Sequence, residues 1–334
     1  MDENLVDVKI DVSISIPIIG DKSISLLNPP DGFEYKIIKL DEYEYKNKII
    51  DGNGDILFDF TDAIHVDNGE EYILVLSYNK IIACKSEVHV NSVGALNNGM
   101  PIFEKIKDDF DELLFKYFSL IHIYKEGDVT QKVSFYKFTV QEGMCKNCLS
   151  SSTQSADSNT LNLHPLIVKE EDVSEINKYL SCDDRIYKIL RNAVLSDLLY
   201  SYHIFDFTTN YKNLCSTLEV MFIKREEKSN KKKMLSSRIA VFLEEDDVLI
   251  KNLYKKVKVL YGIRGEAVHA GKSVEESKLL ELRDLLRKCI KKYIQLINEK
   301  FVNRNNVNFG DVRGEIIRIA EKKIADKKKL KLFG

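Results

Sequence analysis

Residues 247–271 read DVLIKNLYKKVKVLYGIRGEAVHAG, and this stretch decides the fold expected for the second half of the chain. Its apolar residues recur every three or four positions, which is the spacing of one buried helix face. This face would consist of Ile250, Leu253, Val257, Leu260 and Tyr261. Asp246 or Asp247 suits the N-cap, and Gly271 suits the position after the C-cap. The stretch therefore predicts one amphipathic helix that ends just before Gly271.

The same helical periodicity continues on both sides of this stretch, from about residue 170 onward. Further helices are predicted at Val173–Leu180, Asp184 to about Tyr202, about Thr208–Arg225, Met234–Leu243, Val274 to about Ile297 and about Val312–Lys328. Ser273 suits the N-cap of the helix that would begin at Val274. Short connections favour antiparallel neighbours, so residues 169–300 are expected to form an all-α antiparallel helical bundle. Residues 301–334 would form a basic helical tail.

Residues 1–148 follow a different pattern, in which apolar and polar residues alternate. Val6, Ile10, Val12, Ile14 and Ile16 share one parity, and the turn signal DGNG at residues 51–54 precedes another short apolar run. One main helix is expected with Pro101 in its first turn. Residues 149–168 are mostly small and polar, which predicts a linker. The expected fold class is therefore α+β with two domains. The first is β-rich with one main helix and would be a sensor or regulatory domain, and the second is all-α.

Composition and charge limit the kinds of ligand and location that this chain is expected to have. The net charge of -2 gives no overall attraction to nucleic acid, so RNA binding would need a local basic surface. No apolar run is long enough to span a bilayer and the N-terminus is acidic, so we expect a cytoplasmic protein without membrane contact. The six cysteines do not form a disulfide pattern. Cys145 and Cys148 have zinc-ligand spacing, but no second pair follows, so we expect no metal and no cofactor. The alternative is a different enzyme class in which Cys145 and Cys148 hold zinc.

Arg264 and His269 form the constellation that could carry chemistry. RNA is cleaved when its 2′-OH attacks the adjacent phosphate, which needs a base near neutral pH and a cation for the phosphorane charge. Histidine, with an unperturbed pKa of about 6.5, suits the first role, and arginine suits the second. Five residues of ideal helix leave the two side chains about 140° apart. They would meet if the helix bends near Gly265 or ends before His269, or if two copies form a composite cleft, which we favour.

The pattern of Arg264, four residues, then His269, late in a helical bundle, resembles the HEPN superfamily of ribonucleases. The surrounding sequence resembles its Apea-like branch over about residues 170–300. The resemblance is carried by Asn213–Phe222, by Leu235–Leu243 and by Leu260–Gly271. It implies a dimeric, metal-independent endoribonuclease that acts on RNA in antiphage defence or as a toxin. It also implies that Arg264 and His269 are catalytic; an antitoxin or a phage-derived trigger would remain to be found.

Three further residues are candidates for supporting roles at this site. Glu219 could orient Arg264 or Arg238, Tyr261 could contact a base, and Glu266 lies inside the motif. Many active members of the family have a polar residue where this chain has Gly265. That departure favours the alternative of an inactive HEPN-like module for dimerisation or nucleic-acid binding. Two lysine-rich segments, Lys224–Lys233 and the tail after Lys322, could attract phosphates, although such runs are usually solvated.

Overall fold

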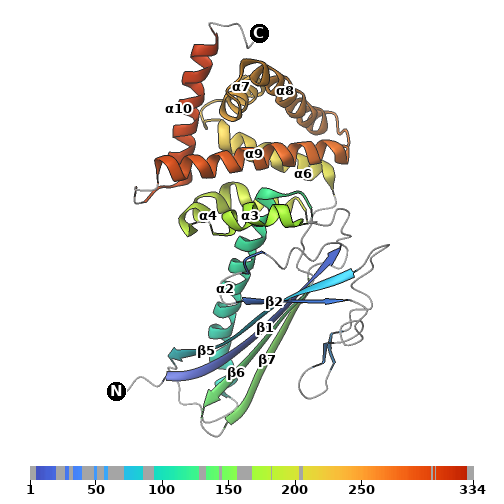
Figure 1. Cartoon of the computed structure of the whole chain (residues 1–334), viewed down its shortest axis with the longest axis vertical. Coiled ribbons are helices and arrows are strands. Elements are labelled where there is room, and N and C mark those ends of the chain that lie inside the picture. The colour runs from blue at the N-terminus through green and yellow to red at the C-terminus, as the bar shows by residue number, and fades with distance from the viewer. Residues whose placement is uncertain are drawn as a thin grey trace. The chain divides into compact units, whose positions relative to one another are not determined.

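The computed structural model divides the chain into two compact units (Figure 1). Unit 1 comprises Met1–Phe118 and Gly127–Leu180, and unit 2 comprises Ser119–Glu126 and Ser181–Gly334. Side chains are described mainly in residues 108–127, 168–202 and 206–327, apart from short gaps. The structure describes the backbone of residues 5–19, 27–29, 33–39, 49–50, 56–58, 71–85, 94–127, 133–142, 145–155, 168–181, 183–202, 206–301, 304 and 306–328.

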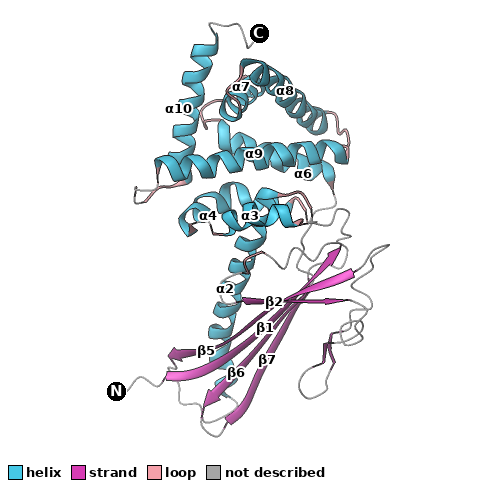
Figure 2. Ribbon diagram, viewed as in Figure 1, coloured by secondary structure: helices cyan, strands magenta, loops and turns pink. Residues whose placement is uncertain are grey.

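The described backbone of unit 1 contains extended segments and two helices (Figure 2). The extended segments are β1 (Leu5–Ile19), β2 (Phe33–Lys39), β3 (Ile49–Ile50), β4 (Ile56–Phe58), β5 (Glu71–Lys85), β6 (Val133–Glu142) and β7 (Cys145–Ser155). Their antiparallel pairing follows the order β2-β5-β1-β6-β7, with β3 and β4 paired separately. The helices are α3 (Glu170–Leu180) and α2 (Gly94–Tyr124), whose last residues belong to unit 2.

The predicted α+β fold class with a β-rich N-terminal domain has to be corrected. The strands named above are described by their backbone. In the part of the chain that can be interpreted together with its side chains, 80% of the residues are helical and no sheet is present, so a β-rich domain is not seen there. The physical reason is that alternation indicates only where an extended backbone is favoured. A β-rich domain also needs the apolar faces of its strands packed in a core, and the described core is built on helices.

Two local predictions for the first half of the chain also differ from the structure. Helix α2 begins at Gly94, so Pro101 lies inside the helix and not in its first turn. Proline fixes a φ angle that suits a helix but lacks one N–H donor, so its presence alone does not locate the helix start. The expected linker, residues 149–168, begins within β7, and α3 belongs to unit 1.

Unit 2 is a helical bundle, and each helix predicted there from periodicity is present. After Asp184 the chain forms one nearly continuous helical stretch, which includes a π-helical turn, and then five longer helices. The elements are α4 (Asp184–Leu190), η3 (Arg191–Leu195), α5 (Ser196–Tyr200), α6 (Phe207–Phe222), α7 (Lys231–Leu243), α8 (Asp247–His269), α9 (Glu276–Lys300) and α10 (Phe309–Lys328). Helix α8 packs against α6 and α7, while α6 also packs against α9 and α10 packs against α7.

Aromatic rings fill the centre of the bundle. Phe222 of α6, Phe242 of α7 and Tyr293 of α9 contact one another edge to face, with centroids 5.4 to 5.8 Å apart. Each such pair adds about 0.5–1.5 kcal/mol to the stabilisation from burial. The buried Tyr293 hydroxyl donates to the carbonyl of Met221 at 2.6 Å, so its polar end is satisfied. These contacts fix α6 relative to α7 and α9.

The ends of α8 are set by local sequence, whereas the start of α9 is not. Asp246 accepts hydrogen bonds from the backbone N–H groups of residues 248 and 249, and Gly271 has a φ of +63°, so both predicted caps of α8 are confirmed. The predicted N-cap Ser273 is wrong, because α9 begins only at Glu276. Val274 is buried, and its N–H donates to the hydroxyl of Thr208 on α6 at 3.1 Å. The residue just before α9 is therefore held by a contact with α6.

Candidate functional site

Both residues of the predicted site lie on α8. The helix is continuous from Asp247 to His269, so it does not end before His269. Five helical residues rotate by about 500°, which leaves the side chains of Arg264 and His269 about 140° apart around the axis. Within one chain, the two side chains therefore leave α8 in different directions.

Glu219 on α6 is the centre of a polar cluster that links α6, α7 and α8. Its Oε1 accepts a hydrogen bond from the Tyr261 hydroxyl at 2.6 Å and lies 3.3 Å from Nη2 of Arg264. Its Oε2 accepts a hydrogen bond from Nζ of Lys231 at 2.7 Å. We call Glu219, Lys231, Tyr261 and Arg264 the Glu219 cluster. Of the two arginines that Glu219 could have oriented, it contacts Arg264 and not Arg238.

Arg264 is positioned by this cluster but keeps its hydrogen-bond donors largely unused. Its guanidinium carbon lies 5.6 Å from the centre of the Tyr261 ring, and its side chain is 29% exposed. Its Nε is buried without a partner, and Glu219 provides the one ionic contact of the guanidinium within the described residues. The buried Nε is out of reach of a ligand, but the terminal nitrogens make no hydrogen bond with the described residues, so the partly exposed guanidinium can bind a further acceptor such as a phosphate oxygen.

Electrostatics keep the cluster in one protonation state near neutral pH. Partial burial acts to raise the pKa of Glu219, but hydrogen bonds from Lys231 and Tyr261 and the charge of Arg264 outweigh it and lower the pKa. Partial burial and the hydrogen bond to Glu219 raise the pKa of Tyr261, so its hydroxyl stays a neutral donor. One carboxylate thus faces two cations, and the cluster has a formal charge of about +1.

Cys215 lies one turn before Glu219 on α6 and is buried. Burial raises the pKa of Cys215 to about 12, although the nearby charge of Arg264 acts in the opposite direction. A thiol in this state is protonated at neutral pH and is a poor nucleophile. Cys215 is therefore a packing residue beside the cluster, and the groups of the cluster that could bind an anion are Lys231 and Arg264.

His269 and Glu266 lie outside the Glu219 cluster. His269 is exposed in the last turn of α8 and has no hydrogen bond or ion pair with the described residues. Glu266 is exposed and pairs with Lys272 at 2.8 Å, and this hydrogen bond lowers the pKa of Glu266. The structure thus brings Glu219 and Tyr261 to Arg264, and leaves Glu266 and His269 on another side of α8.

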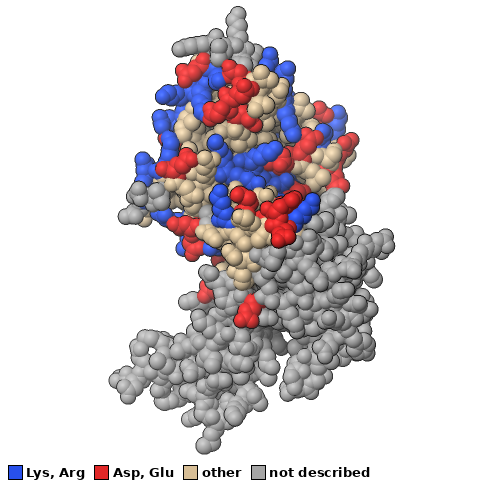
Figure 3. Space-filling view, in the orientation of Figure 1, with Lys and Arg blue, Asp and Glu red and all other residues tan. Residues whose placement is uncertain are grey.

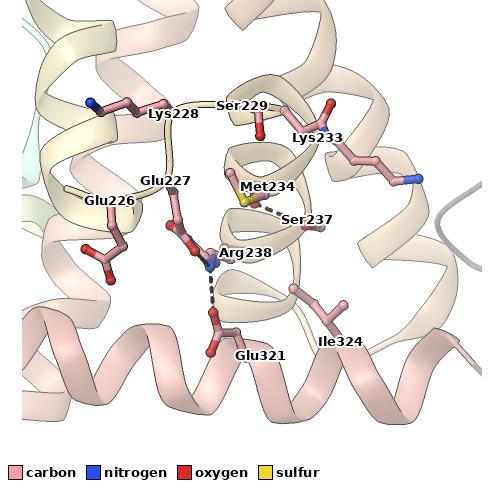
Figure 4. Close-up of a pocket in the computed structure, with 11 residues that line it drawn as sticks. Glu226, Glu227, Lys228, Ser229, Lys233, Met234, Ser237, Arg238, Glu321 and Ile324 are labelled. Carbon is pink, nitrogen blue, oxygen red and sulfur yellow. Dashed lines mark hydrogen bonds and ion pairs between the residues drawn. The ribbon is translucent and has the colours of Figure 1, made fainter. Parts of the chain in front are cut away.

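Arg238 on α7 has the opposite environment to Arg264 (Figure 4). Its side chain is 4% exposed, and its terminal nitrogens donate to the Phe222 carbonyl at 2.8 Å and to Glu227 and Glu321 at 2.6 Å. It lines a pocket of about 420 Å³ beside the turn that joins α6 to α7. Because both terminal nitrogens are occupied, Arg238 holds α6, α7 and α10 together and has little capacity for a ligand.

The two lysine-rich segments differ in how the structure uses them. Lys231, at the start of α7, belongs to the Glu219 cluster, a role that its place in a charge run did not predict. In α10, Lys323 donates to Glu245 at 2.6 Å and Lys327 pairs with Asp247. These tail lysines are therefore neutralised by acids next to α8. On the face of unit 2 drawn in Figure 3, Lys and Arg side chains gather over α9 with acidic groups around them.

The described part of the chain contains neither a cluster of metal-ligating side chains nor a helix suited to cross a membrane. No group of three or more His, Cys, Asp or Glu side chains that could hold a metal ion occurs among the described residues. Cys145 and Cys148 lie in β7, outside the residues whose side chains are described. None of the described helices combines the length and the apolar character needed to cross a bilayer.

Comparisons with known proteins do not identify a family. Neither protein-family models, nor curated proteins, nor solved structures gave a significant match to this chain. The function therefore has to be argued from the residues of unit 2 themselves.

Proposed function

We propose that unit 2 is a metal-independent endoribonuclease in which Arg264 binds the scissile phosphate and His269 transfers a proton. The observation that supports this most is the state of Arg264. Its guanidinium is positioned beside Glu219 and the Tyr261 ring, yet its terminal nitrogens make no hydrogen bond with the described residues and its side chain is 29% exposed. A preorganised cation with unused donors is what a developing phosphorane charge requires. The resemblance of the Arg264–His269 spacing to HEPN ribonucleases supports the same function.

The proposed reaction needs no metal ion or cofactor. The imidazole of His269 removes the proton of the 2′-OH as its oxygen attacks the adjacent phosphorus. The new bond joins the 2′-oxygen to phosphorus, and the bond from phosphorus to the 5′-oxygen breaks. The departing 5′-oxygen takes up a proton from water, so the site needs one imidazole and one guanidinium. The products are a 2′,3′-cyclic phosphate and a 5′-OH.

The geometry of α8 leads us to propose that the complete site contains two copies of the chain. A separation of about 140° around one helix does not place both side chains on one phosphate. A two-fold axis beside the end of α8 would bring the exposed His269 of one copy toward Arg264 of the other. The exposure of His269 is compatible with such a contact.

Cleavage of end-labelled RNA in the presence of EDTA tests the activity. The wild-type protein is expected to cut, and the fragments should carry cyclic phosphate ends. Arg264→Ala and His269→Ala should each lose cutting by about 10²–10³-fold, the range for removing one group that stabilises transition-state charge. Lys272→Ala, a change to an exposed lysine near His269, serves as the control. Equal cutting by the wild type and both variants would disprove the proposed site.

A complementation experiment tests whether the site is composite. Arg264→Ala and His269→Ala proteins are mixed, unfolded and refolded together, so that about half of the dimers contain one chain of each kind. If Arg264 and His269 act from different copies, each mixed dimer keeps one intact pair, and about a quarter of the wild-type activity returns. If both act from one chain, the mixture stays inactive, and the composite arrangement is wrong.

A bundle that binds RNA without cutting it is the second candidate function. It is favoured by the direction of His269 away from Arg264 and by the ion pair that already engages Arg264. In this case RNA binding would depend on Arg264 while the wild type leaves RNA intact in EDTA.

A role as a toxin or in defence against phage is part of the first proposal, the endoribonuclease. It predicts that the wild type, but not His269→Ala, arrests growth of a bacterial host.

A further inference from the structure

Lys232, which the proposed reaction does not use, lies across α8 at Gly262. A Cβ atom built on Gly262 would be 2.8 Å from Nζ of Lys232 and 3.6 Å from its Cε. A glycine in the middle of a helix costs roughly 1 kcal/mol relative to alanine. Glycine at this position lets the ammonium group of Lys232 lie directly on α8, and a larger side chain would shift this flexible end of the lysine.

Gly262 marks the stripe of α8 that also carries His269. Positions 262, 266 and 269 are spaced four and three residues apart, which is the spacing of one helix face. His269 lies seven residues beyond Gly262, so the two positions nearly coincide around the axis and are about 10 Å apart along it. Glu266 lies between Gly262 and His269, and its pKa is lowered mainly by Lys272 and also by the charge of Lys232. Lys232 therefore lies on the His269 side of α8.

Lys232 is also free to bind an anion, unlike the lysine next to it. Lys231 donates to Glu219 at 2.7 Å and is committed to the Glu219 cluster. Lys232 is exposed, and its ammonium has no hydrogen bond or ion pair with the described residues. Glu266, the acid on the same stripe, is already paired with Lys272. The stripe thus presents one unpaired ammonium beside an exposed imidazole.

We infer that Lys232, seated over Gly262, is an RNA-contacting residue that holds a phosphate neighbouring the one at His269. The inference rests on the proposed function for the identity of the ligand. It adds a positioning role, since a lysine about 10 Å from the imidazole along the helix fixes how a single strand passes His269. Gly262 is then part of the binding site, because it makes room for the ammonium group.

The test measures binding alone, in a protein that also carries His269→Ala and cannot cut. A fluorescently labelled single-stranded RNA is titrated, and its anisotropy is followed at several salt concentrations. Each phosphate contact to a single strand adds about 0.7 to the slope of log K against log salt, so Lys232→Ala should lower the slope by about 0.7 and the affinity at 0.1 M salt about fivefold. Lys233→Ala, the next exposed lysine on α7, should leave both unchanged.

A double-mutant cycle tests the role of Gly262. Gly262→Ala should weaken binding less than Lys232→Ala, because the flexible end of Lys232 can shift, and in the Lys232→Ala background it should weaken binding no further. Gly265→Ala is the matched control, because nothing lies within 4 Å of a Cβ built there. Thermal unfolding of each variant checks that the bundle is intact.

The outcomes separate this inference from the proposed nuclease activity. If Lys232→Ala and Lys233→Ala bind alike, or if the His269→Ala protein does not bind RNA at all, the inference is wrong. If binding depends on Lys232 while the wild type fails to cut RNA in EDTA, the RNA-contact role holds and the nuclease proposal fails. A loss shared by Lys232→Ala and Gly262→Ala, and absent from both controls, establishes the contact.

Discussion

Two arginines of unit 2, Arg238 and Arg264, each lie beside a glutamate, yet they differ in what remains for a ligand. Arg238 is 4% exposed and bonds Glu227, Glu321 and a backbone carbonyl through both terminal nitrogens. Arg264 has one ionic contact at 3.3 Å with Glu219, and its Nε is buried without a partner. The first arrangement satisfies the guanidinium, whereas the second only positions it.

This difference distinguishes an arginine that stabilises the fold from one that can still bind a ligand. A buried group whose donors are all used contributes to stability and resists removal, because its partners would be left unpaired. A guanidinium with unused donors can form new hydrogen bonds when a phosphate binds to it. Substitution by alanine should therefore lower the free energy of unfolding mainly at Arg238, and should lower the RNA-cleavage activity mainly at Arg264.

The largest effect is expected from Arg238→Ala. Removing this arginine leaves Glu227 and the Phe222 carbonyl without their partner, so the free energy of unfolding should fall by roughly 3–5 kcal/mol. Arg264→Ala, at a partly exposed ion pair, should lower it by no more than about 1 kcal/mol. Urea denaturation of both variants, followed by the helical circular dichroism signal, measures the two losses. Similar losses for both variants would remove the distinction.

Arg264→Lys is expected to have the next largest effect, and on cleavage alone. Lysine keeps the positive charge beside Glu219 but lacks the planar fork that binds two phosphate oxygens. The cleavage rate should fall by about 10²-fold, or about 2.7 kcal/mol, while stability stays close to that of the wild type. Single-turnover cleavage with excess protein measures the chemical step. Full activity in Arg264→Lys would show that charge, without geometry, is sufficient.

A pH-dependent effect of intermediate size is expected at Glu227. The hydrogen bond from Arg238 lowers the pKa of Glu227 below its ordinary value of 4.5. A lowered pKa stabilises the folded state above pH 4.5, and this stabilisation is lost as the pH falls toward the folded value. Glu227→Gln should therefore be less stable than the wild type by about 1–3 kcal/mol at neutral pH. The gap should shrink well below pH 4.5.

Urea denaturation of the wild type and Glu227→Gln across this range tests the pH dependence. Lys228→Gln, a neutralising change at the neighbouring residue of the same turn, controls for altered net charge. A gap that stays constant on acidification would mean that the charge of Glu227 does not stabilise Arg238.

The smallest effect is expected from Gly265→Ala. Position 265 is helical, and nothing lies within 4 Å of a Cβ built there, so alanine should raise the free energy of unfolding by about 0.5–1 kcal/mol. RNA cleavage should be unchanged, since Gly265 contacts neither cation. A loss of stability, measured by thermal unfolding, would show that α8 needs flexibility beside Arg264.

Much of unit 2 could be predicted because helical periodicity and capping are local properties. Asp246 caps α8 and Gly271 follows its end as the sequence indicates, since each acts on its own neighbours. Ser273 is not the cap, because α9 begins only at Glu276, and the buried Val274 before it contacts Thr208 on another helix, which local sequence does not indicate. In the first half of the chain, alternation indicated extended backbone, but it could not establish a β-rich domain, which the fully interpretable residues do not show.

The helical character of unit 2 follows from its periodic apolar residues, and the angle between Arg264 and His269 follows from their spacing along one helix. Folding of the chain was needed to show that Glu219 pairs with Arg264 and not Arg238, and that the ammonium group of Lys232 lies on α8 at Gly262. These choices depend on how α6, α7 and α8 cross and on how deeply each side chain is buried. Contacts between segments distant in sequence leave no periodic signal, so they become visible only when the chain is folded.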